Sequence, residues 1–92
     1  MHVLAIHEIS DPEGFQAAEE RLEAEIAEDG WSEGVRGNPI TLFSPDHRHE
    51  FCLFEADSVE AVRALVEEKL AAPWSKNTYV EIDSASVPAL KS

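Results

Sequence analysis

The chain has a single cysteine, Cys52, and no long apolar run. One cysteine excludes an intramolecular disulfide framework, and its apolar neighbours favour a reduced, buried thiol over a nucleophile. A membrane-spanning helix needs about 20 consecutive apolar residues, and no segment approaches this length. The opening MHVLAIHEIS is too short and too polar to be a secretory signal. We therefore expect a cytoplasmic protein.

Basic residues are also scarce, because 7 lysines and arginines face 19 aspartates and glutamates, giving a formal net charge of −12. Nucleic acids and anionic membranes bind through Lys and Arg, so both are excluded as expected partners. The acidic excess also favours solubility. The four glycines follow no phosphate-binding spacing, which excludes the common nucleotide-binding loops.

At 92 residues the chain predicts one domain, residues 1–92, near the lower size limit for a self-sufficient core. Its composition, 43% hydrophobic and 28% charged, is that of a folded globular protein. For so small a chain, oligomerisation is a natural way to bury more apolar surface.

Two helices are clearly delimited. The first spans 10–30, with Asp11 as the expected N-cap, Pro12 in the first turn and Gly30 as the C-terminal glycine. The second spans 57–71, where Asp57 and Glu60 have the spacing of a capping box. Both contain apolar residues at intervals of three and four, which predicts one buried face on each helix.

Strands are expected at 3–9, 35–43 and 49–56, with the last within 77–87. The turn SPDHR joins the second and third strands as a hairpin. The resulting order β-α-β-β-α-β predicts a ferredoxin-like α+β domain, a four-stranded antiparallel sheet with both helices on one face. Strands one and three should form its central pair.

The strands are apolar on both faces, although helices can cover only one. The other face should therefore meet a partner. We expect a homodimer whose two sheets pack face to face around a cavity, as in a dimeric α+β barrel.

A ligand site is expected in this inter-sheet cavity. If Leu4 and Ile6 pack beneath the helices, then His7 points into the cavity, together with Tyr79 and Glu81. A few polar groups among apolar walls are typical of a small-molecule pocket. The alternative is that His7 only bonds a carboxylate and stabilises the dimer.

Strand 49–56 leaves its orientation open, because Phe51, Leu53 and Glu55 alternate with the apolar Cys52 and Phe54. If Glu55 faces the cavity it meets His7 on the neighbouring strand, and the pair could serve as acid and base or as metal ligands. If it faces away, Glu55 is simply solvated.

His47 and His49 lie two residues apart, so an extended chain would place both imidazoles on one side. Such a pair could bind nickel or zinc, with further ligands from Asp46, Glu50, His2 or another subunit. The competing interpretation is a polar hairpin tip.

The segment 44–67, SPDHRHEFCLFEADSVEAVRALVE, resembles a family of small bacterial ferredoxin-like proteins with a strand like FCLYEA and a helix like PEAVREAA. Members are mostly of unknown function, and some bind nickel. More broadly, the chain resembles dimeric α+β barrel proteins, which include cofactor-free monooxygenases, isomerases and stress-responsive proteins. The resemblance implies the fold and a homodimer, but the matched segment contains no clear ligand set for nickel.

We therefore expect a homodimer that binds a small ligand or a divalent metal in or near the inter-sheet cavity, with no cofactor required. One alternative is a cofactor-independent enzyme on a small organic substrate, with His7 as general base and Tyr79 or Glu81 orienting the substrate. A purely structural or regulatory dimer is the third hypothesis. Binding is preferred to catalysis because no residues form a complete catalytic constellation.

Overall fold

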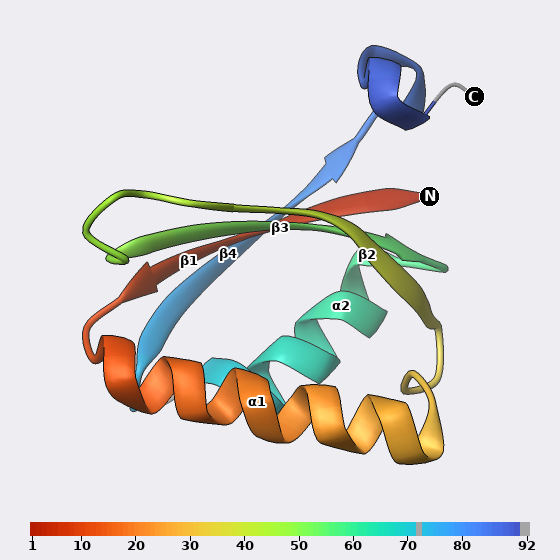
Figure 1. Cartoon of the computed structure of the whole chain (residues 1–92). Helices are drawn as coiled ribbons and strands as arrows, with labels where there is room; N and C mark the ends of the chain where they lie inside the picture. Colours follow the sequence, from red (N-terminus) through yellow and green to blue (C-terminus); the bar gives the residue numbers. More distant parts are fainter. Residues whose placement is uncertain (72, 91–92) are drawn as a thin grey trace.

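The computed structural model describes residues 1–71 and 73–90. Four antiparallel strands form one sheet in the order β2-β3-β1-β4, and two helices lie across one of its faces (Figure 1). The element bounds are β1 His2–Ile9, α1 Pro12–Asp29, β2 Val35–Phe43, β3 His49–Ala56, α2 Val59–Val66 and β4 Ser75–Ile82. A π-helical turn, Glu67–Ala71, follows α2. The predicted ferredoxin-like α+β fold is confirmed, as is the central position of β1 and β3.

Local capping explains where the helices begin and end. The side chain of Asp11 accepts a hydrogen bond from the Gly14 backbone N–H at 3.1 Å, and Pro12 is the first helical residue of α1. Gly30 ends the helix at φ 82°, a left-handed conformation that glycine adopts without a Cβ penalty. These three predicted roles are confirmed.

The predicted cap of α2 is wrong by one residue. Ser58, not Asp57, accepts the hydrogen bond from the Ala61 backbone N–H, at 3.1 Å. Asp57 instead pairs with Arg36 at the start of β2. The Asp57 side chain thus forms a salt bridge to β2 and does not cap α2. The hydroxyl oxygen of the adjacent Ser58 accepts the capping hydrogen bond instead.

The helices cover the opposite set of β1 side chains from the one predicted. Val3, Ala5, His7 and Ile9 are buried beneath the helices, whereas Leu4 and Ile6 lie on the other face and are partly exposed. Both sets are apolar enough to be covered, so alternation alone could not select between them. Because strand side chains alternate with period two, this choice inverts the expected positions of His7, Tyr79 and Glu81.

The face away from the helices, called here the open face, is apolar. Cross-strand register places Leu53 opposite Leu4, Phe51 opposite Ile6, and Val80 on the other side of Leu4. Residues toward its edges remain accessible, with Leu42 59% and Val80 46% exposed. The full apolar set of the open face is Leu4, Ile6, Ile40, Leu42, Phe51, Leu53, Val80 and Ile82. The expectation that both sheet faces are apolar is confirmed.

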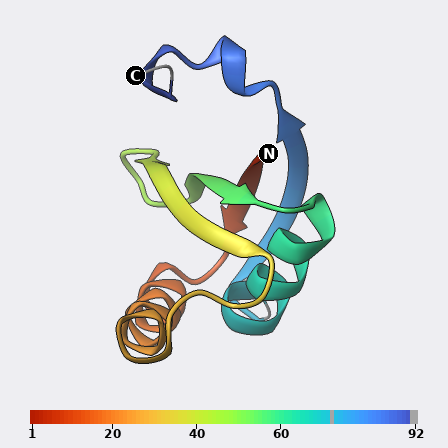
Figure 2. The same cartoon turned by 90° about the vertical axis from the view of Figure 1, so that its right-hand side faces the viewer.

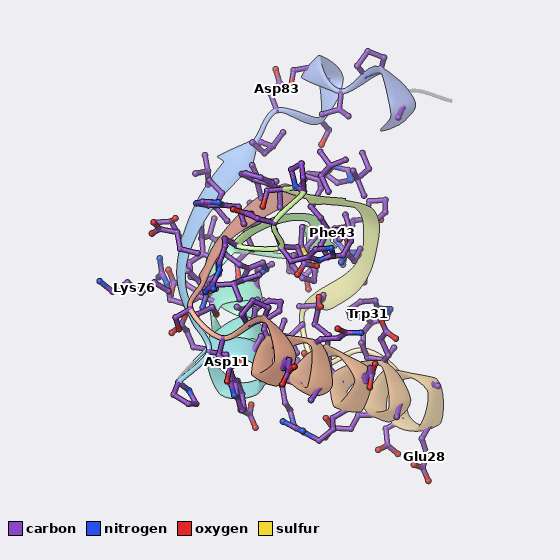
Figure 3. All side chains as sticks on the ribbon, turned by 60° about the vertical axis from the view of Figure 1, so that its left-hand side comes forward. Asp11, Glu28, Trp31, Phe43, Lys76 and Asp83 are labelled. Carbon is purple, nitrogen blue, oxygen red and sulfur yellow. The ribbon has the colours of Figure 1, made fainter. Side chains whose placement is uncertain are left out.

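The end of the chain lies on the same side as the open face. Beyond β4, two short helical turns at Ser84–Ser86 and Pro88–Leu90 stand on the side of the sheet opposite α1 and α2 (Figure 2). The imidazole of His2 contacts the Ser84 hydroxyl at 2.5 Å, which joins this segment to the first strand. On the helix side, Trp31 lies between α1 and the sheet and packs edge-on against Phe54 (Figure 3).

None of the helices in the described part of the chain is long and apolar enough to cross a membrane.

We predict that Ser58→Ala lowers the free energy of unfolding by about 1 kcal/mol, because the first turn of α2 loses its side-chain acceptor. Asp57→Ala should cost less, since Asp57 takes part only in an exposed ion pair. Urea unfolding of both variants measures the difference. A larger loss for Asp57→Ala would contradict the assignment of Ser58 as the cap.

Candidate functional site

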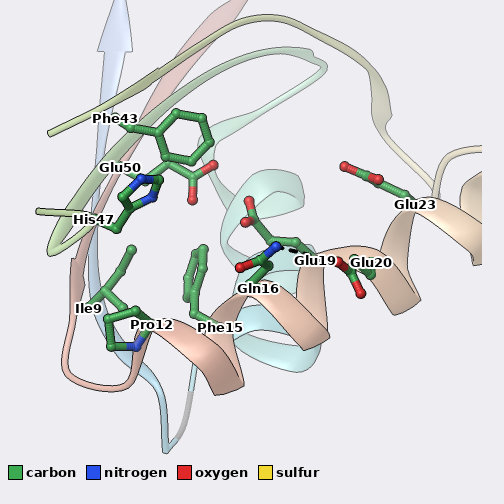
Figure 4. A pocket seen from close by; sticks show the side chains of 10 residues that line it. All are labelled: Ile9, Pro12, Phe15, Gln16, Glu19, Glu20, Glu23, Phe43, His47 and Glu50. Carbon is green, nitrogen blue, oxygen red and sulfur yellow. Dashed lines mark hydrogen bonds between the residues drawn. The ribbon is translucent and has the colours of Figure 1, made fainter. Parts of the chain in front are cut away.

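A cleft of about 420 Å³ opens between α1 and the β2–β3 hairpin, on the helix side of the sheet (Figure 4). Its apolar walls come from Ile9, Pro12, Phe15 and Phe43. Its polar groups are Gln16 and three carboxyl groups from α1, with Glu50 from β3 and His47 from the hairpin. A volume of this size suits a small organic molecule.

Glu50 forms the inner end of the cleft, and its side chain is almost fully buried at 1% exposure. It faces the helices because it alternates with Cys52 and Phe54 along β3, both of which are buried on the same face. One carboxylate oxygen, Oε1, accepts a weak hydrogen bond from the Cys52 thiol at 3.5 Å. The other, Oε2, is buried without a partner among the described residues. An unpaired buried carboxylate oxygen is costly, so its presence calls for an explanation.

Glu19 on α1 faces Glu50 across the cleft, and the two carboxyl groups point toward one another (Figure 4). Burial, followed by the neighbouring carboxyl of Glu50 and the charge of Glu23, raises the pKa of Glu19 to about 9. Glu19 is therefore protonated at neutral pH. A neutral Glu19 avoids the repulsion between two facing negative charges.

His7 lies next to Glu50, as its direct cross-strand partner on β1, and is fully buried. Its ring packs against that of Phe15 on α1, with centroids 5.2 Å apart. Burial lowers the pKa of His7, although the hydrogen bond to Asn77 and the nearby Glu50 and Glu67 oppose this shift. The imidazole is therefore neutral at neutral pH.

The hydrogen bonds around Asn77 select one tautomer of this neutral ring. The Asn77 amide donates to Glu67 at 3.2 Å, which turns its oxygen toward His7. The His7 Nδ1 atom lies 2.5 Å from that oxygen, and because an amide oxygen can only accept, Nδ1 carries the proton. Nε2 therefore presents a lone pair, and it too is buried without a partner among the described residues.

Cys52 completes the buried polar group beneath the sheet. Burial, and then the adjacent Glu50 carboxyl, raise the pKa of the Cys52 thiol well above its ordinary value. The thiol is thus a neutral donor at neutral pH, which agrees with the prediction that it is a buried thiol and not a nucleophile.

No lysine or arginine pairs with Glu19 or Glu50 within residues 1–71 and 73–90. The described ion pairs instead lie at exposed positions, such as Arg63 with Glu60 and Lys69 with Glu25. The cleft thus concentrates carboxyl groups on one wall without a built-in cation.

The predicted placement of His7 and Tyr79 in an inter-sheet cavity is wrong. Both side chains face the helices, because β1 and β4 present the opposite alternation to the one expected. The Tyr79 hydroxyl donates to Glu67, and Arg63 lies over its ring at 5.2 Å from the centroid. Burial and then Glu67 raise the pKa of Tyr79, so it stays protonated. Glu81 follows on the same side and is exposed.

Glu55 does not meet His7. It lies on the open face opposite His2, whereas the residue opposite His7 is Glu50. Glu55 is half exposed and lies 3.9 Å from Arg36. The orientation that the sequence left open is thus settled, with Glu55 in solvent and Glu50 buried.

His47 and His49 are not on one side of an extended strand. His47 sits in the turn at φ 59°, with its ring 5.4 Å from that of Phe43, and it lines the cleft described above. His49 begins β3 and lines a separate surface pocket with Glu8 and Lys76. Within the described ranges, no three His, Cys, Asp or Glu side chains are grouped as a metal site would require.

Sequence reasoning missed Glu50 and Glu19 as site residues, although each carried a signal. Glu50 is the one charged residue in the alternation Glu50, Cys52, Phe54 and Ala56, which is otherwise a core-facing set. Glu19 follows Phe15 by four residues and so borders the apolar stripe of α1. A charge on a buried face points to a site more strongly than a pair of histidines in a turn.

No protein-family model matches the chain, and no curated protein or solved structure is significantly similar to it. The ferredoxin-like assignment therefore rests on the order and pairing of its strands.

We predict that Glu19 makes the protein less stable as the pH rises from about 4.5 to about 9. The folded chain retains a proton that the unfolded chain loses in this range, so stabilisation present below the ordinary pKa disappears toward the raised one. Glu19→Gln removes this titration. At about pH 8.5 its free energy of unfolding should exceed that of the wild type by about 1 to 2 kcal/mol, allowing for solvent screening of a half-buried side chain.

Urea unfolding across this pH range measures the effect. Glu28→Gln, at an exposed position near the end of the same helix, is the matched control and should follow the wild-type profile. A Glu19→Gln profile parallel to the wild type at every pH would contradict the assignment.

Proposed function

We propose that the protein binds a small organic ligand in the cleft between α1 and the β2–β3 hairpin. The observation that carries this proposal is the unpaired, buried Glu50 Oε2 at the inner end of a cleft that combines apolar and aromatic side chains with a group of carboxyl groups. Polar atoms in a protein interior are nearly always satisfied, and those left unpaired are commonly completed by a bound molecule. An apolar pocket with a few convergent polar groups is the usual form of a small-ligand site.

This site differs in position from the inter-sheet cavity expected from the sequence. The enzyme alternative required His7 in that cavity with Tyr79 or Glu81 beside the substrate, and the burial of His7 beneath the helices removes its basis. Glu50 and Glu19 take the place of the predicted ligand-binding set, with His7 as the buried neighbour of Glu50.

The resemblance of segment 44–67 to small bacterial proteins, some of which bind nickel, makes a divalent metal the second ligand class to test. His47 is the predicted metal ligand that also lines the cleft. A cytoplasmic setting is part of the same proposal, since the single, buried thiol needs no oxidising compartment.

Benzylamine, benzyl alcohol and benzoate are suitable probes, because they share one ring and carry a cationic, a neutral and an anionic polar group. We expect at least one of them, at about 10 mM, to shift the backbone amide resonances of Gln16, Glu19, His47 and Glu50 in two-dimensional NMR spectra. Amides on the open face, such as Val80, should remain unshifted. Nickel and zinc chlorides form the metal arm of the same titration.

Gln16→Trp should abolish these shifts by filling the cleft mouth from an exposed helix position, whereas Ala27→Trp, exposed further along α1, should leave them intact. If no organic probe perturbs the cleft, the proposal fails. Shifts confined to His47 and His49 with nickel would favour the metal class instead.

We also propose that the chain forms a homodimer through its open face. The support is a continuous apolar surface with accessible Leu42 and Val80, on a chain too small to cover both sheet faces with two helices. A second copy offers an equal apolar face in a symmetric, self-complementary contact. The cleft lies on the helix side, so this dimer leaves two independent sites open to solvent.

Light scattering should give a mass twice that of one chain, and Val80→Glu should give the monomer, because it buries a charge in the interface. Ala27→Glu places the same charge on the exposed surface of α1 and should remain dimeric. A monomeric wild type would overturn the dimer. A dimer whose cleft binds none of the probes would favour the purely structural or regulatory hypothesis.

A further inference from the structure

The inner end of the cleft presents a buried hydrogen-bond acceptor, Glu50 Oε2, that has no donor among the described residues. Glu50 Oε2 is unpaired, and so is the neighbouring His7 Nε2, whose lone pair follows from the proton held on Nδ1 by Asn77. Both side chains are at least 99% buried. Glu50 lines the cleft, whereas His7 is its cross-strand neighbour outside the lining, so a ligand in the cleft needs a donor for Glu50 Oε2.

The cleft walls carry a matching negative charge and an aromatic surface. Glu19, Glu20 and Glu23 line it from α1, and no lysine or arginine is among its lining residues. On the opposite wall, Phe43 is 54% exposed, so its ring is available to a ligand. Anionic ligands would be repelled here, and a cation beside aromatic rings is favoured by their negative faces.

We propose that the ligand is a small organic cation whose primary ammonium group is bound by Glu50 and Glu19 at the inner end of the cleft, with its apolar part against Phe15 and Phe43. This inference rests on the proposed function and names the ligand class of the same site. An ammonium group supplies three donors and one positive charge, so it can donate to the unpaired Glu50 Oε2 and compensate the charge of the Glu50 carboxylate. A neutral alcohol supplies a donor but leaves the charge uncompensated.

Binding of such a cation displaces the proton of Glu19, because the positive charge of an ammonium group between the two carboxyl groups favours the ionised form of Glu19. The charged and titratable groups that face Glu19 are Glu20 and Glu23 on its own helix, Glu50 and Cys52 on β3, and His47 at the hairpin. The neighbouring carboxylates favour retention of the proton by Glu19, whereas the positive charge of the bound ligand favours its release. Affinity should therefore increase as the pH rises toward 9.

The three probes distinguish the proposal of a cationic ligand from the broader proposal of any small organic ligand in the cleft. Isothermal titration at neutral pH and constant ionic strength should give an affinity for benzylamine at least about tenfold higher than for benzyl alcohol, with benzoate weakest. Equal or tighter binding of benzyl alcohol or benzoate at the cleft would overturn the cation, while leaving the ligand site standing. Absence of all three from the cleft would overturn both.

Two variants test the assigned residues against one control. Glu50→Gln should remove the preference for benzylamine over benzyl alcohol, whereas Glu28→Gln, exposed on α1 outside the cleft, should preserve it. Retention of the full preference in Glu50→Gln would contradict the proposal. If Glu50→Gln does not fold, Glu19→Gln serves as the second variant. Titrations in phosphate and HEPES buffers, neither of which carries a primary amine, report the proton released.

The wild type should release close to one proton per benzylamine bound at neutral pH, and Glu19→Gln should release none. Proton release that persists in Glu19→Gln would contradict the role of Glu19. A purely structural role for either residue would change stability without altering the ratio of the two affinities or the proton count.

Discussion

The central constraint on this molecule is the cross-strand pair of His7 and Glu50, two polar side chains buried together beneath the helices. An apolar pair would stabilise the same position without desolvation cost, so the sheet carries a local penalty there. Three neighbours reduce that penalty. Asn77 accepts a hydrogen bond from His7 Nδ1, the Cys52 thiol donates to Glu50, and Glu19 remains protonated beside Glu50. Glu50 Oε2 and His7 Nε2 nevertheless remain unpaired within the described chain, and Glu50 lines the cleft.

The proposed ligand site and the proposed dimer interface lie on opposite faces of the sheet. The helix face contains the polar cluster and the cleft, and the open face contains an apolar surface suited to a second copy. The proposed ligand site and the proposed dimer interface therefore use different residues, and each can be tested without disturbing the other. This differs from the arrangement expected from the sequence, in which one inter-sheet cavity served both purposes.

Much of the fold could be predicted because its signals are local. Asp11, Pro12 and Gly30 delimit α1 through backbone bonds within one turn, and β3 begins and ends at the residues that its alternation indicates. The α2 cap shows where local reasoning stops. Asp57 and Ser58 are both good caps, and only the position of Arg36 on a distant strand decides which of them is free to act.

The sequence by itself determined the order of elements, the caps of α1 and the fact that both sheet faces are apolar. Only the tertiary structure decided which face the helices cover, and with it the positions of His7, Tyr79, Glu55 and the overlooked Glu50. The physical reason is that alternation in a strand defines two sets of side chains but does not indicate which set packs against the helices. When both sets are apolar, the choice depends on packing between segments far apart in the chain.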